Sequence, residues 1–575
     1  MISLTLIQQE RLHRALEPLH QKYDPAEQMI RQPFSSPGYH TTLHGGWVHP
    51  TRDSLQYAVA LLDTGEADLL QRAEAILRHV VALQDKDPAS KTYGIWSWFM
   101  EEPLSKMSPP DWNWADFCGT QLLQVALDHR DRLPAELMTQ VDDAIVHAAR
   151  SIQRRNVSPG YTNIAIMGTY VTLVAANLYK LSDLHDYAFD RLKRFHAYTF
   201  HHGAFTEYNS PTYTIVALNE LGRMCHDVKD ESSLALVNDT YRLAWEEIAQ
   251  HFHAPTHQWA GPHSRCYTTL LGKGTLALIE RATEGHVRFG VNDTTPDLNE
   301  HRLILPCPRD LEPYFTTLDQ PRALVKTFVR DEPPVVGTTY LAPAFALGSI
   351  NRGDLWNQRR ALLAYWGTPE HPSYLHLRFL HDGYDFSAAQ FFSVQQDGKA
   401  LAGINFAVDG GDTHVSLDRI KNATFQAKDL RLRFEIGGAA GLGDFPPDFR
   451  APAVLDEVAS LRWGAVHLQL MVPYASLGNT NGHWEIAHEK DKACLDVVLY
   501  NGPQRSIHLP DMNPMGLGCA VQFSTTEEPL TGVTAKAQDG RLEMQWGVLN
   551  LSLPLMPDKA GILQKSFQSK TSKLI

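Results

Sequence analysis

Apolar residues recur every three or four positions through the first half of the chain. In 161–181 they fall on one helix face, at Ile164, Met167, Val171, Val174, Leu178 and Leu181. The same spacing predicts helices over 54–63, 67–84, 117–129, 134–153, 184–200, 212–226 and 232–251. Short polar breaks and the lack of intervening strands predict successive helical hairpins, which close into a bundle, a solenoid or a toroid.

The pattern changes in the second half of the chain. Residues 291–340 are rich in proline and are expected to form an ordered linker. Period-two alternation follows, as in Leu542, Met544, Trp546 and Val548, with hairpin-type turns at Asp397-Gly398, Asn481-Gly482 and Asp539-Gly540. We therefore expect an α+β multidomain protein, with a helical domain over 1–290 and an antiparallel β-sandwich over 341–575.

Tryptophans lie in polar loops between the predicted helices. Trp47 is in GYHTTLHGGWVHP, Trp96 is in YGIWSWFMEEP, and Trp112 and Asn113 are in PPDWNWADF. Aromatic rings stack on the apolar faces of sugars, so the loops together indicate a cleft that binds carbohydrate. For any single tryptophan, the alternative is that it fills a gap at a helix end.

Composition narrows the function classes. A length of 575 residues predicts two or three domains, and a net charge of −13 without a basic run argues against a nucleic-acid partner. The six cysteines include no CxxC pair, and no apolar run has the length of a membrane span. No metal, cofactor or membrane partner is expected. The N-terminus lacks signal-peptide features, which predicts a cytoplasmic protein unless a signal was trimmed; oligomeric state stays open.

The segment GAFTEYNSPTY, residues 203–213, breaks the helical pattern and ends on Tyr213. A tyrosine hydroxyl, with an ordinary pKa of about 10, can serve as an acid unaided and as a base when nearby charge favours the phenolate. Elimination from a uronic acid needs such a proton carrier for C5 and the C4 oxygen, and a group that neutralises the carboxylate. It needs no metal.

Other residues supply the remaining parts of this scheme. Asn163, in GYTNIAIMG, is a candidate to neutralise the carboxylate, although asparagine also suits a helix N-cap. His263 and Arg265, in AGPHSRCY, could clamp a carboxylate or simply anchor a loop. The expected substrate-binding residues in and around these segments are Glu207, Tyr208, Asn209, Trp112, Asn113, Trp96 and Trp47.

These residues resemble a family. A helical half followed by a β-rich half, with Phe205, Glu207, Ser210, Pro211 and Tyr213 in sequence and an asparagine 50 residues upstream of Tyr213, is similar to polysaccharide lyases of the chondroitin AC/hyaluronate lyase, alginate lyase and heparinase II/III groups. The resemblance implies an N-terminal (α/α) toroid, a C-terminal β-sandwich, and β-elimination on an anionic, uronate-containing glycan. Tyr213 would be the acid/base and Asn163 would neutralise the uronate.

The chain departs from that pattern at one position. The histidine base of the chondroitin-type lyases lies five residues before the tyrosine, where this chain has Tyr208. The β-domain histidines that could replace it are His371, His376 and His381. Tyr213 acting as both base and acid suits syn elimination, whereas an external histidine suits anti elimination.

Alternatives remain open. Asp111 and Asp116, with Glu101, Glu102 and Glu207, could form the paired carboxylates of an (α/α)-barrel glycoside hydrolase. The segment HFHAPTH could bind a metal, a weaker hypothesis because its spacing matches no standard ligand pair. A non-catalytic glycan-binding protein would keep the aromatic loops and tolerate loss of Tyr213, and an epimerase would share the proton removal at C5.

Overall fold

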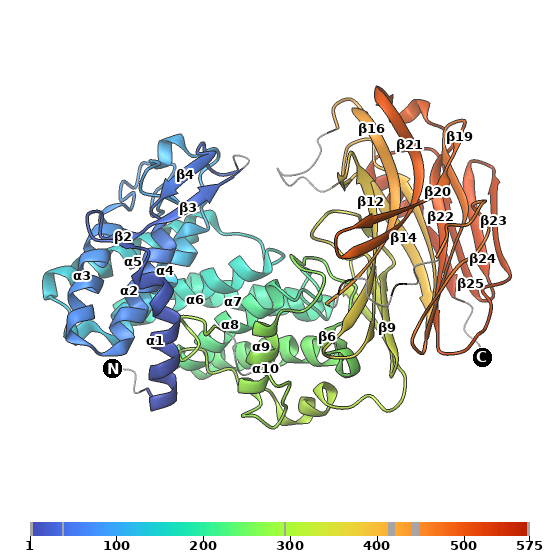
Figure 1. The fold of residues 1–575 in the computed structure, drawn as a ribbon. Helices are drawn as coiled ribbons and strands as arrows, with labels where there is room; N and C mark the ends of the chain where they lie inside the picture. The colour runs from blue at the N-terminus through green and yellow to red at the C-terminus, as the bar shows by residue number, and fades with distance from the viewer. Residues whose placement is uncertain are drawn as a thin grey trace. The chain divides into compact units, whose positions relative to one another are not determined.

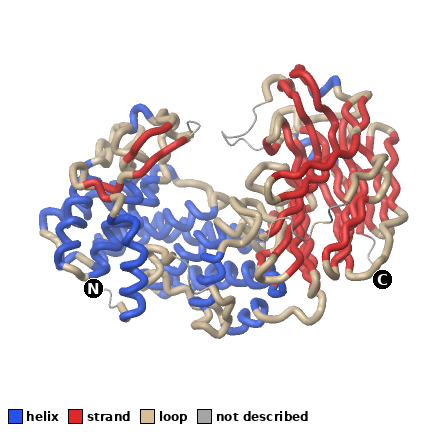
Figure 2. Tube along the Cα trace, in the orientation of Figure 1, coloured by secondary structure: helices blue, strands red, loops and turns tan. Residues whose placement is uncertain are grey.

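The computed structural model describes residues 4–36, 39–291, 295–411, 420–439, 441, 445 and 449–571. The chain divides into two compact units. The first contains Met1–Phe200, Ile215–Ala244 and Val291–Pro306; the second contains His201–Thr214, Trp245–Gly290 and Cys307–Ile575. Helices are concentrated in the N-terminal part of the chain and strands in the C-terminal part (Figure 2), which confirms the expected order of the two classes of structure.

Successive helices make up most of the N-terminal part (Figure 1). They are α1 (Leu6–His20), α2 (Thr51–Thr64), α3 (Ala67–Ala82), α4 (Trp114–Asp128), α5 (Ala135–Arg155), α6 (Thr162–Tyr179), α7 (Ser182–His202), α8 (Tyr213–Asp227), α9 (Glu231–His251) and α10 (Lys273–Ala282). Within the first unit, α2 packs against α3, α4 against α5, and α5 against α6, as hairpins require.

Helix α6 shows how these elements are fixed. The prediction of a single apolar face underestimates the burial of this helix, because every residue from Thr162 to Ala176 is buried. The helix is apolar on nearly all sides, which is typical of one surrounded by other helices. It ends where Lys180 takes a left-handed conformation (φ 55°). The expected N-cap role of Asn163 is wrong, because Tyr161 is the N-cap and Asn163 lies inside the first turn.

The N-terminal part also contains strands that the helical pattern did not predict. They form two small antiparallel sheets, from β1 (Tyr23–Asp24) with β2 (Met29–Ile30), and from β3 (Gln32–Ser35) with β4 (Gly45–Val48). Pro33 and the Gly45-Gly46 pair disfavour helix here, and these two segments adopt extended backbone instead.

The second unit is built mainly of antiparallel strands. They are β5 (Phe252–His253), β6 (Gln258–Trp259), β7 (Arg322–Val329), β8 (Val335–Ala342), β9 (Phe345–Ile350), β10 (Arg352–Asp354), β11 (Leu362–Gly367), β12 (Pro372–His381), β13 (Tyr384–Asp385), β14 (Ala389–Gln396), β15 (Lys399–Phe406), β16 (Thr424–Gly438), β17 (Ala459–Trp463), β18 (Val466–Leu477), β19 (Thr480–Asn481), β20 (His483–Glu489), β21 (Lys492–His508), β22 (Met515–Ser524), β23 (Val533–Gln538), β24 (Arg541–Trp546), β25 (Leu549–Pro554) and β26 (Gln568–Thr571), with a short helix α11 (Ala560–Ser566).

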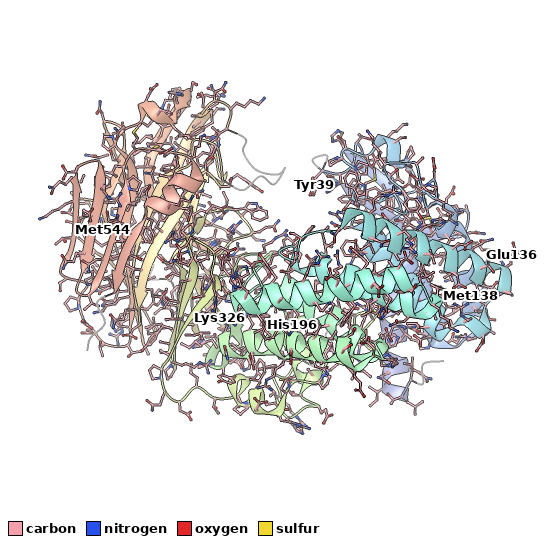
Figure 3. All side chains as sticks on the ribbon, turned by 180° about the vertical axis from the view of Figure 1, so that it is seen from behind. Tyr39, Glu136, Met138, His196, Lys326 and Met544 are labelled. Carbon is pink, nitrogen blue, oxygen red and sulfur yellow. The ribbon has the colours of Figure 1, made fainter. Side chains whose placement is uncertain are left out.

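Two large sheets enclose the main core of this unit. One is nine-stranded, with the order β20-β21-β16-β12-β11-β9-β8-β7 and β13 paired to β12; the other is seven-stranded, with the order β10-β14-β15-β22-β18-β17 and β19 paired to β18. Buried side chains from both sheets form one cluster between them. A third sheet, β23-β24-β25-β26, packs through Leu542, Met544 and Trp546 against the second one (Met544 is labelled in Figure 3). The period-two pattern of β24 is thereby confirmed.

Two local expectations differ from the structure. Strands β7 and β8 already belong to the nine-stranded sheet, although they lie in the segment expected to be a linker. Asn481-Gly482 is not a hairpin turn: Asn481 pairs with Ser476, and Gly478 makes the turn with φ 60°. The neighbours of Gly482 leave no space for a larger residue, since an added Cβ would lie 2.9 Å from Val497 and 3.1 Å from Ala475.

Candidate active site

The segment 203–213 connects α7 to α8 and belongs to the second unit, where the loop 257–267 holds it. Asn209 is fully buried and its amide donates to the carbonyls of Ala260 and Pro262, both at 2.8 Å. The indole of Trp259 donates to the Asn209 side-chain oxygen at 2.5 Å. Asn209 has φ 42°, a left-handed conformation that asparagine tolerates well. It is a clamp between two loops.

Ser210 connects the start of α8 to the same loop, 257–267. Its hydroxyl donates to the carbonyl of Arg265 at 2.6 Å and accepts from the backbone N–H of Tyr213 at 2.9 Å. Such an acceptor satisfies a free N–H in the first turn of a helix. The buried carboxylate of Glu247 accepts from the N–H of Asn209 and the hydroxyl of Thr214, both at 2.9 Å. Tyr213 and Arg265 are therefore positioned by one network.

Tyr213 is the centre of a group of polar and aromatic side chains. Its hydroxyl lies 2.6 Å from that of Tyr267, which is 57% exposed. The guanidinium of Arg265 lies over the Tyr213 ring, 4.2 Å from its centroid. Arg265 also donates to Glu207 at 3.2 Å and to the side-chain oxygen of Gln358 at 3.1 and 2.9 Å. The arrangement fixes both the plane and the direction of the guanidinium.

Burial raises the pKa of Tyr213 well above its ordinary value, and the hydrogen bond with Tyr267 raises it further. The positive charge of Arg265 opposes both effects. At neutral pH Tyr213 is therefore a neutral phenol, ready to donate a proton. To accept one it must first pass its own proton on, and the exposed Tyr267 hydroxyl is the group in contact with it.

A polar pocket of about 540 Å³ begins at Tyr267 and extends over the outer face of the nine-stranded sheet. Alternate residues of β12 contribute Tyr374, His376 and Arg378, because side chains two apart share one face of a strand. Glu435 accepts from Tyr374 at 2.9 Å and pairs with Arg378 at 2.6 Å and with Lys492 at 2.9 Å. The pocket is a preformed site with both signs of charge.

His376 is the predicted β-domain histidine that lines this pocket. Burial, together with the charges of Arg360 and Arg378, holds its pKa well below the usual range, so the ring is neutral. Nε2 of His381 instead donates to the carbonyl of Gln426, 2.7 Å away, and the ring contacts Phe386 and Phe425. His371 follows a turn at the end of β11 and is exposed.

Three predicted site residues of the second unit are structural. His263 is 1% exposed, its Nδ1 lies 2.6 Å from the carbonyl of Asn209, and burial lowers its pKa to about 3. A neutral, covered imidazole does not clamp a carboxylate. Tyr208 stacks on Phe328 in the core with ring centroids 4.4 Å apart. Asn209 uses its side chain within the protein, as described above, so none of the three presents a group for a substrate.

The remaining predicted residues lie in the first unit. Asn163 is buried and its side-chain oxygen has no hydrogen-bond partner within the described ranges. Trp96 is fully buried and its indole donates to the carbonyl of Val80 at 2.8 Å, so it packs the interior. Trp47 is 58% exposed, and Arg31 lies over its ring. Trp112 donates to the Lys91 carbonyl at 3.2 Å.

Asn113 is held by two neighbours in the same unit. It donates to the hydroxyl of Tyr161 at 3.1 Å and accepts from Arg155 at 2.5 Å. Asp111 and Asp116, the pair of the hydrolase alternative, lie two and three positions from it in the chain. Asp111 accepts from the Trp98 indole at 3.2 Å and from the Asn113 N–H at 3.0 Å, and burial raises the pKa of Asp116 to about 7. Asp116 is 2% exposed, which keeps its carboxyl from a bulky glycan.

Two of the three histidines considered for a metal, His251 and His253, are engaged elsewhere. His251 contacts the Glu247 carbonyl, and both nitrogens of His253 are hydrogen-bonded, to Thr256 and to the Ala342 carbonyl. Among the residues that the structure describes, the cluster with ligand-like spacing is His201, His202 and Asp331. Nδ1 of His202 accepts from the Arg330 N–H, which leaves the proton of the neutral ring on Nε2, the atom facing Asp331. That tautomer is a poor metal ligand.

Sequence reasoning missed Tyr267, Gln358 and the polar face of β12. Tyr267 follows Arg265 by two positions in a loop without regular structure, so no periodicity pointed to it. The alternation of Tyr374, His376 and Arg378 with leucine and phenylalanine was a readable signal of a polar sheet face. Gln358 carries no local signal, because its role arises only from folding next to Arg265.

The chain was compared with known proteins. Residues 10–280 match the model of a domain of unknown function (DUF8769), and no curated protein sequence matches. Among solved structures, the chain is similar to a heparinase III, with a TM-score of 0.50 at 9% identity, covering 96% of this chain and 92% of the other. It is also similar to the chondroitin AC lyase of Streptomyces coelicolor A3, with a TM-score of 0.51 at 12% identity, covering 96% and 86%.

The chain has the fold of these polysaccharide lyases. The expected fold class, a helical toroid followed by an antiparallel β-sandwich, is thereby confirmed. At such low identity the similarity concerns the fold alone. Within the described residues, no helix has the length and apolarity needed to cross a membrane.

Proposed function

We propose that the protein is a lyase that cleaves a uronate-containing glycan by β-elimination. The observation that carries this proposal is the contact between the hydroxyls of Tyr213 and Tyr267, with the Arg265 guanidinium over the Tyr213 ring. Proton removal beside a carboxylate requires a proton carrier and is favoured by a nearby cation, and a second hydroxyl can relay the proton to solvent. The lyase fold of the whole chain supports the same reading.

In the proposed reaction the C5–H bond gives its electron pair to a new C4–C5 double bond, and the bond from C4 to the leaving oxygen breaks. Tyr213 gives up its own proton to water, directly or through Tyr267, whose hydroxyl takes that proton as it releases its own to solvent; the Tyr213 phenolate then takes the C5 proton and returns it to the leaving oxygen. Arg265 offsets part of the cost of the phenolate, because its positive charge lowers the pKa of Tyr213. The role of Asn163 in neutralising the uronate stays a prediction, since Asn163 belongs to the other unit and is 5% exposed.

The test is an ultraviolet screen for unsaturated products. Purified protein, treated with EDTA, is incubated with alginate, glucuronan, glycosaminoglycans and uronate heteroglycans. We expect absorbance to rise with at least one of them, and Tyr213→Phe to lower kcat by about 10²- to 10⁴-fold, the usual contribution of an acid/base group. Tyr474→Phe, on β18, is the matched control and keeps the native rate.

Each other outcome opposes the proposal in its own way. New reducing ends without absorbance indicate a glycoside hydrolase, and deuterium entering C5 without cleavage indicates an epimerase. Binding without any chemical change indicates a non-catalytic protein. A Tyr213→Phe variant with native activity would show that Tyr213 is not the proton carrier.

A further inference from the structure

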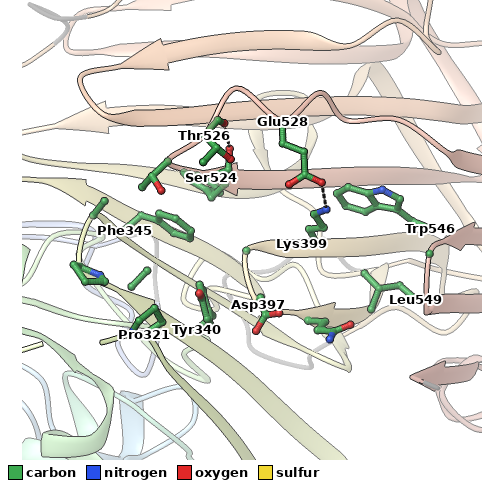
Figure 4. Close-up of a pocket in the computed structure, with 18 of the residues that line it drawn as sticks. Pro321, Tyr340, Phe345, Asp397, Lys399, Ser524, Thr526, Glu528, Trp546 and Leu549 are labelled. Atoms are coloured by element: carbon green, nitrogen blue, oxygen red, sulfur yellow. Dashed lines mark hydrogen bonds and ion pairs between the residues drawn. The ribbon is translucent and has the colours of Figure 1, made fainter. Parts of the chain in front are cut away.

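A second pocket lies in the β-rich unit, lined by residues other than those of the Tyr213 group (Figure 4). It forms where three hairpin turns and the end of one strand meet: the turns β8–β9, β14–β15 and β24–β25, and the end of β22. These elements come from the three larger sheets of the unit. Its volume of about 610 Å³ is within the usual range of small-molecule sites, about 300–1,000 Å³.

The walls of this pocket, which we name the three-sheet pocket, are rigid. Gly398 sits so close to its neighbours that an added Cβ would lie 2.2 Å from the carbonyl of Phe523 and 3.1 Å from the ring of Phe345. The Phe523 N–H donates back to the Gly398 carbonyl at 2.8 Å. Asp397 occupies a left-handed position (φ 51°) in the same turn. The turn that carries Asp397 is thus fixed before any ligand arrives.

The floor of the three-sheet pocket is apolar and its rim is polar. Phe345, Trp546 and Leu549 are buried, while the ring of Tyr340 is half-buried and lies 5.9 Å from Phe345. Ser524 and Thr526 add hydroxyls at the rim. Aromatic and aliphatic surface beside a few polar groups suits a sugar, which has apolar C–H faces and an equatorial ring of hydroxyls.

The charges select against an anionic ligand. Lys399 pairs with Glu528 at 2.9 Å and lies 5.4 Å from the centroid of the Trp546 ring. In the described part of the chain, the exposed carboxylate of Asp397 forms no ion pair or hydrogen bond. The charged side chains that line the pocket are thus two carboxylates, Asp397 and Glu528, and one ammonium, Lys399, so the net charge of the lining is negative. Asp397 repels a uronate or a phosphate and accepts hydrogen bonds from neutral hydroxyls.

We propose that the three-sheet pocket is a non-catalytic binding site for an uncharged sugar unit. This binding site is additional to the proposed elimination, and the proposal for it does not depend on that reaction. Asp397, Tyr340 and the rim hydroxyls bind neutral sugar units of the substrate glycan, or of a neutral glycan that accompanies it. The Tyr213 group takes no part.

Isothermal titration calorimetry tests the proposal with defined probes. These are the neutral tetrasaccharides of glucose, mannose, galactose and xylose, with tetragalacturonate as the charged probe. We expect at least one neutral tetrasaccharide to bind in the millimolar range or better. Asp397→Asn should weaken it about five- to tenfold, as when a charge-assisted hydrogen bond becomes a neutral one. Ala344→Trp, which fills the pocket, should abolish it.

Matched controls separate this site from folding and from catalysis. Asp539→Asn changes the same kind of Asp-Gly turn (φ 51°) outside the pocket and should leave binding unchanged. Tyr213→Phe should bind the neutral probe as the native protein does, whatever its effect on elimination. The proposal is overturned if no neutral probe binds, if Ala344→Trp binds normally, or if tetragalacturonate binds more tightly than every neutral probe and loses that binding in Ala344→Trp.

Discussion

Replacing Asn209 by alanine tests whether one buried amide holds the catalytic loop. The change removes two donors to the Ala260 and Pro262 carbonyls and the acceptor of the Trp259 indole. Each buried group left without a partner costs about 1–3 kcal/mol. A left-handed alanine adds about 1–2 kcal/mol. Because the carbonyls and indole can relax in part, we expect a net loss of about 3–5 kcal/mol.

Amide hydrogen exchange followed by mass spectrometry reports this loss locally, without requiring the two units to unfold together. A loss of about 3–5 kcal/mol predicts exchange roughly two to four orders of magnitude faster in peptides spanning 203–213 and 257–267. Asn209→Gly is the first control, since it loses the same hydrogen bonds without the backbone strain. Asn156→Ala is the second, followed in peptides that span residue 156, since Asn156 has a similar φ of 43° but is exposed.

The expected order of local stability is native, then Asn156→Ala, then Asn209→Gly, then Asn209→Ala. If Asn209→Ala exchanges no faster than Asn156→Ala, the hydrogen bonds of Asn209 do not hold the loop. If Asn209→Gly equals the native protein while Asn209→Ala does not, backbone conformation alone accounts for the effect, and the clamp described above is wrong.

Three further predictions concern protonation. Tyr267→Phe removes a hydrogen bond that raises the pKa of Tyr213, so this pKa should fall in ultraviolet phenolate titrations; no change would contradict the contact. Burial alone would raise the pKa of Asp63, but Arg302 and two histidines hold it below its usual range. Asp63→Asn should therefore cost about 3–5 kcal/mol in urea unfolding at pH 7 and progressively less below pH of about 4, and a pH-independent cost would refute this. Burial also lowers the pKa of His251, His253 and His263 in the second unit. The unfolded chain protonates them near pH 6.5, so the free energy of unfolding should fall by about 1.4 kcal/mol for each between pH 7.5 and 5.5. Amide exchange rates that stay constant over this range, once corrected for their intrinsic dependence on pH, would contradict the burial of these rings.

The helical half was readable because burial follows the helix period. The spacing of Ile164, Met167, Val171 and Val174 located α6 within a few residues. It did not show that α6 is surrounded, since a helix buried on all sides and one buried on one side share the same core positions. Strand β24 could be predicted for the same reason, because its buried and exposed residues alternate with a period of two.

The candidate site was only partly readable. Tyr213 and Arg265 are chemically unusual within their segments, and the structure brings them together. Asn209 and His263 were chosen for the same polarity, but the chain uses that polarity to satisfy its own buried carbonyls and amides. Whether a polar side chain serves the backbone or a ligand depends on what folds against it. For Asn209, those neighbours lie about 50 residues further along the chain.

The membership of His201–Thr214 in the β-rich unit has a consequence for how such proteins can be recombined. A crossover between two relatives near residue 290 joins the helices and GAFTEYNSPTY of one parent to the sheets of the other. The Arg265–Gln358 contact would then combine residues of two parents that were never selected together. Chimaeras should retain folded helices yet lose activity, unless the residues facing Arg265 are transferred with the loop.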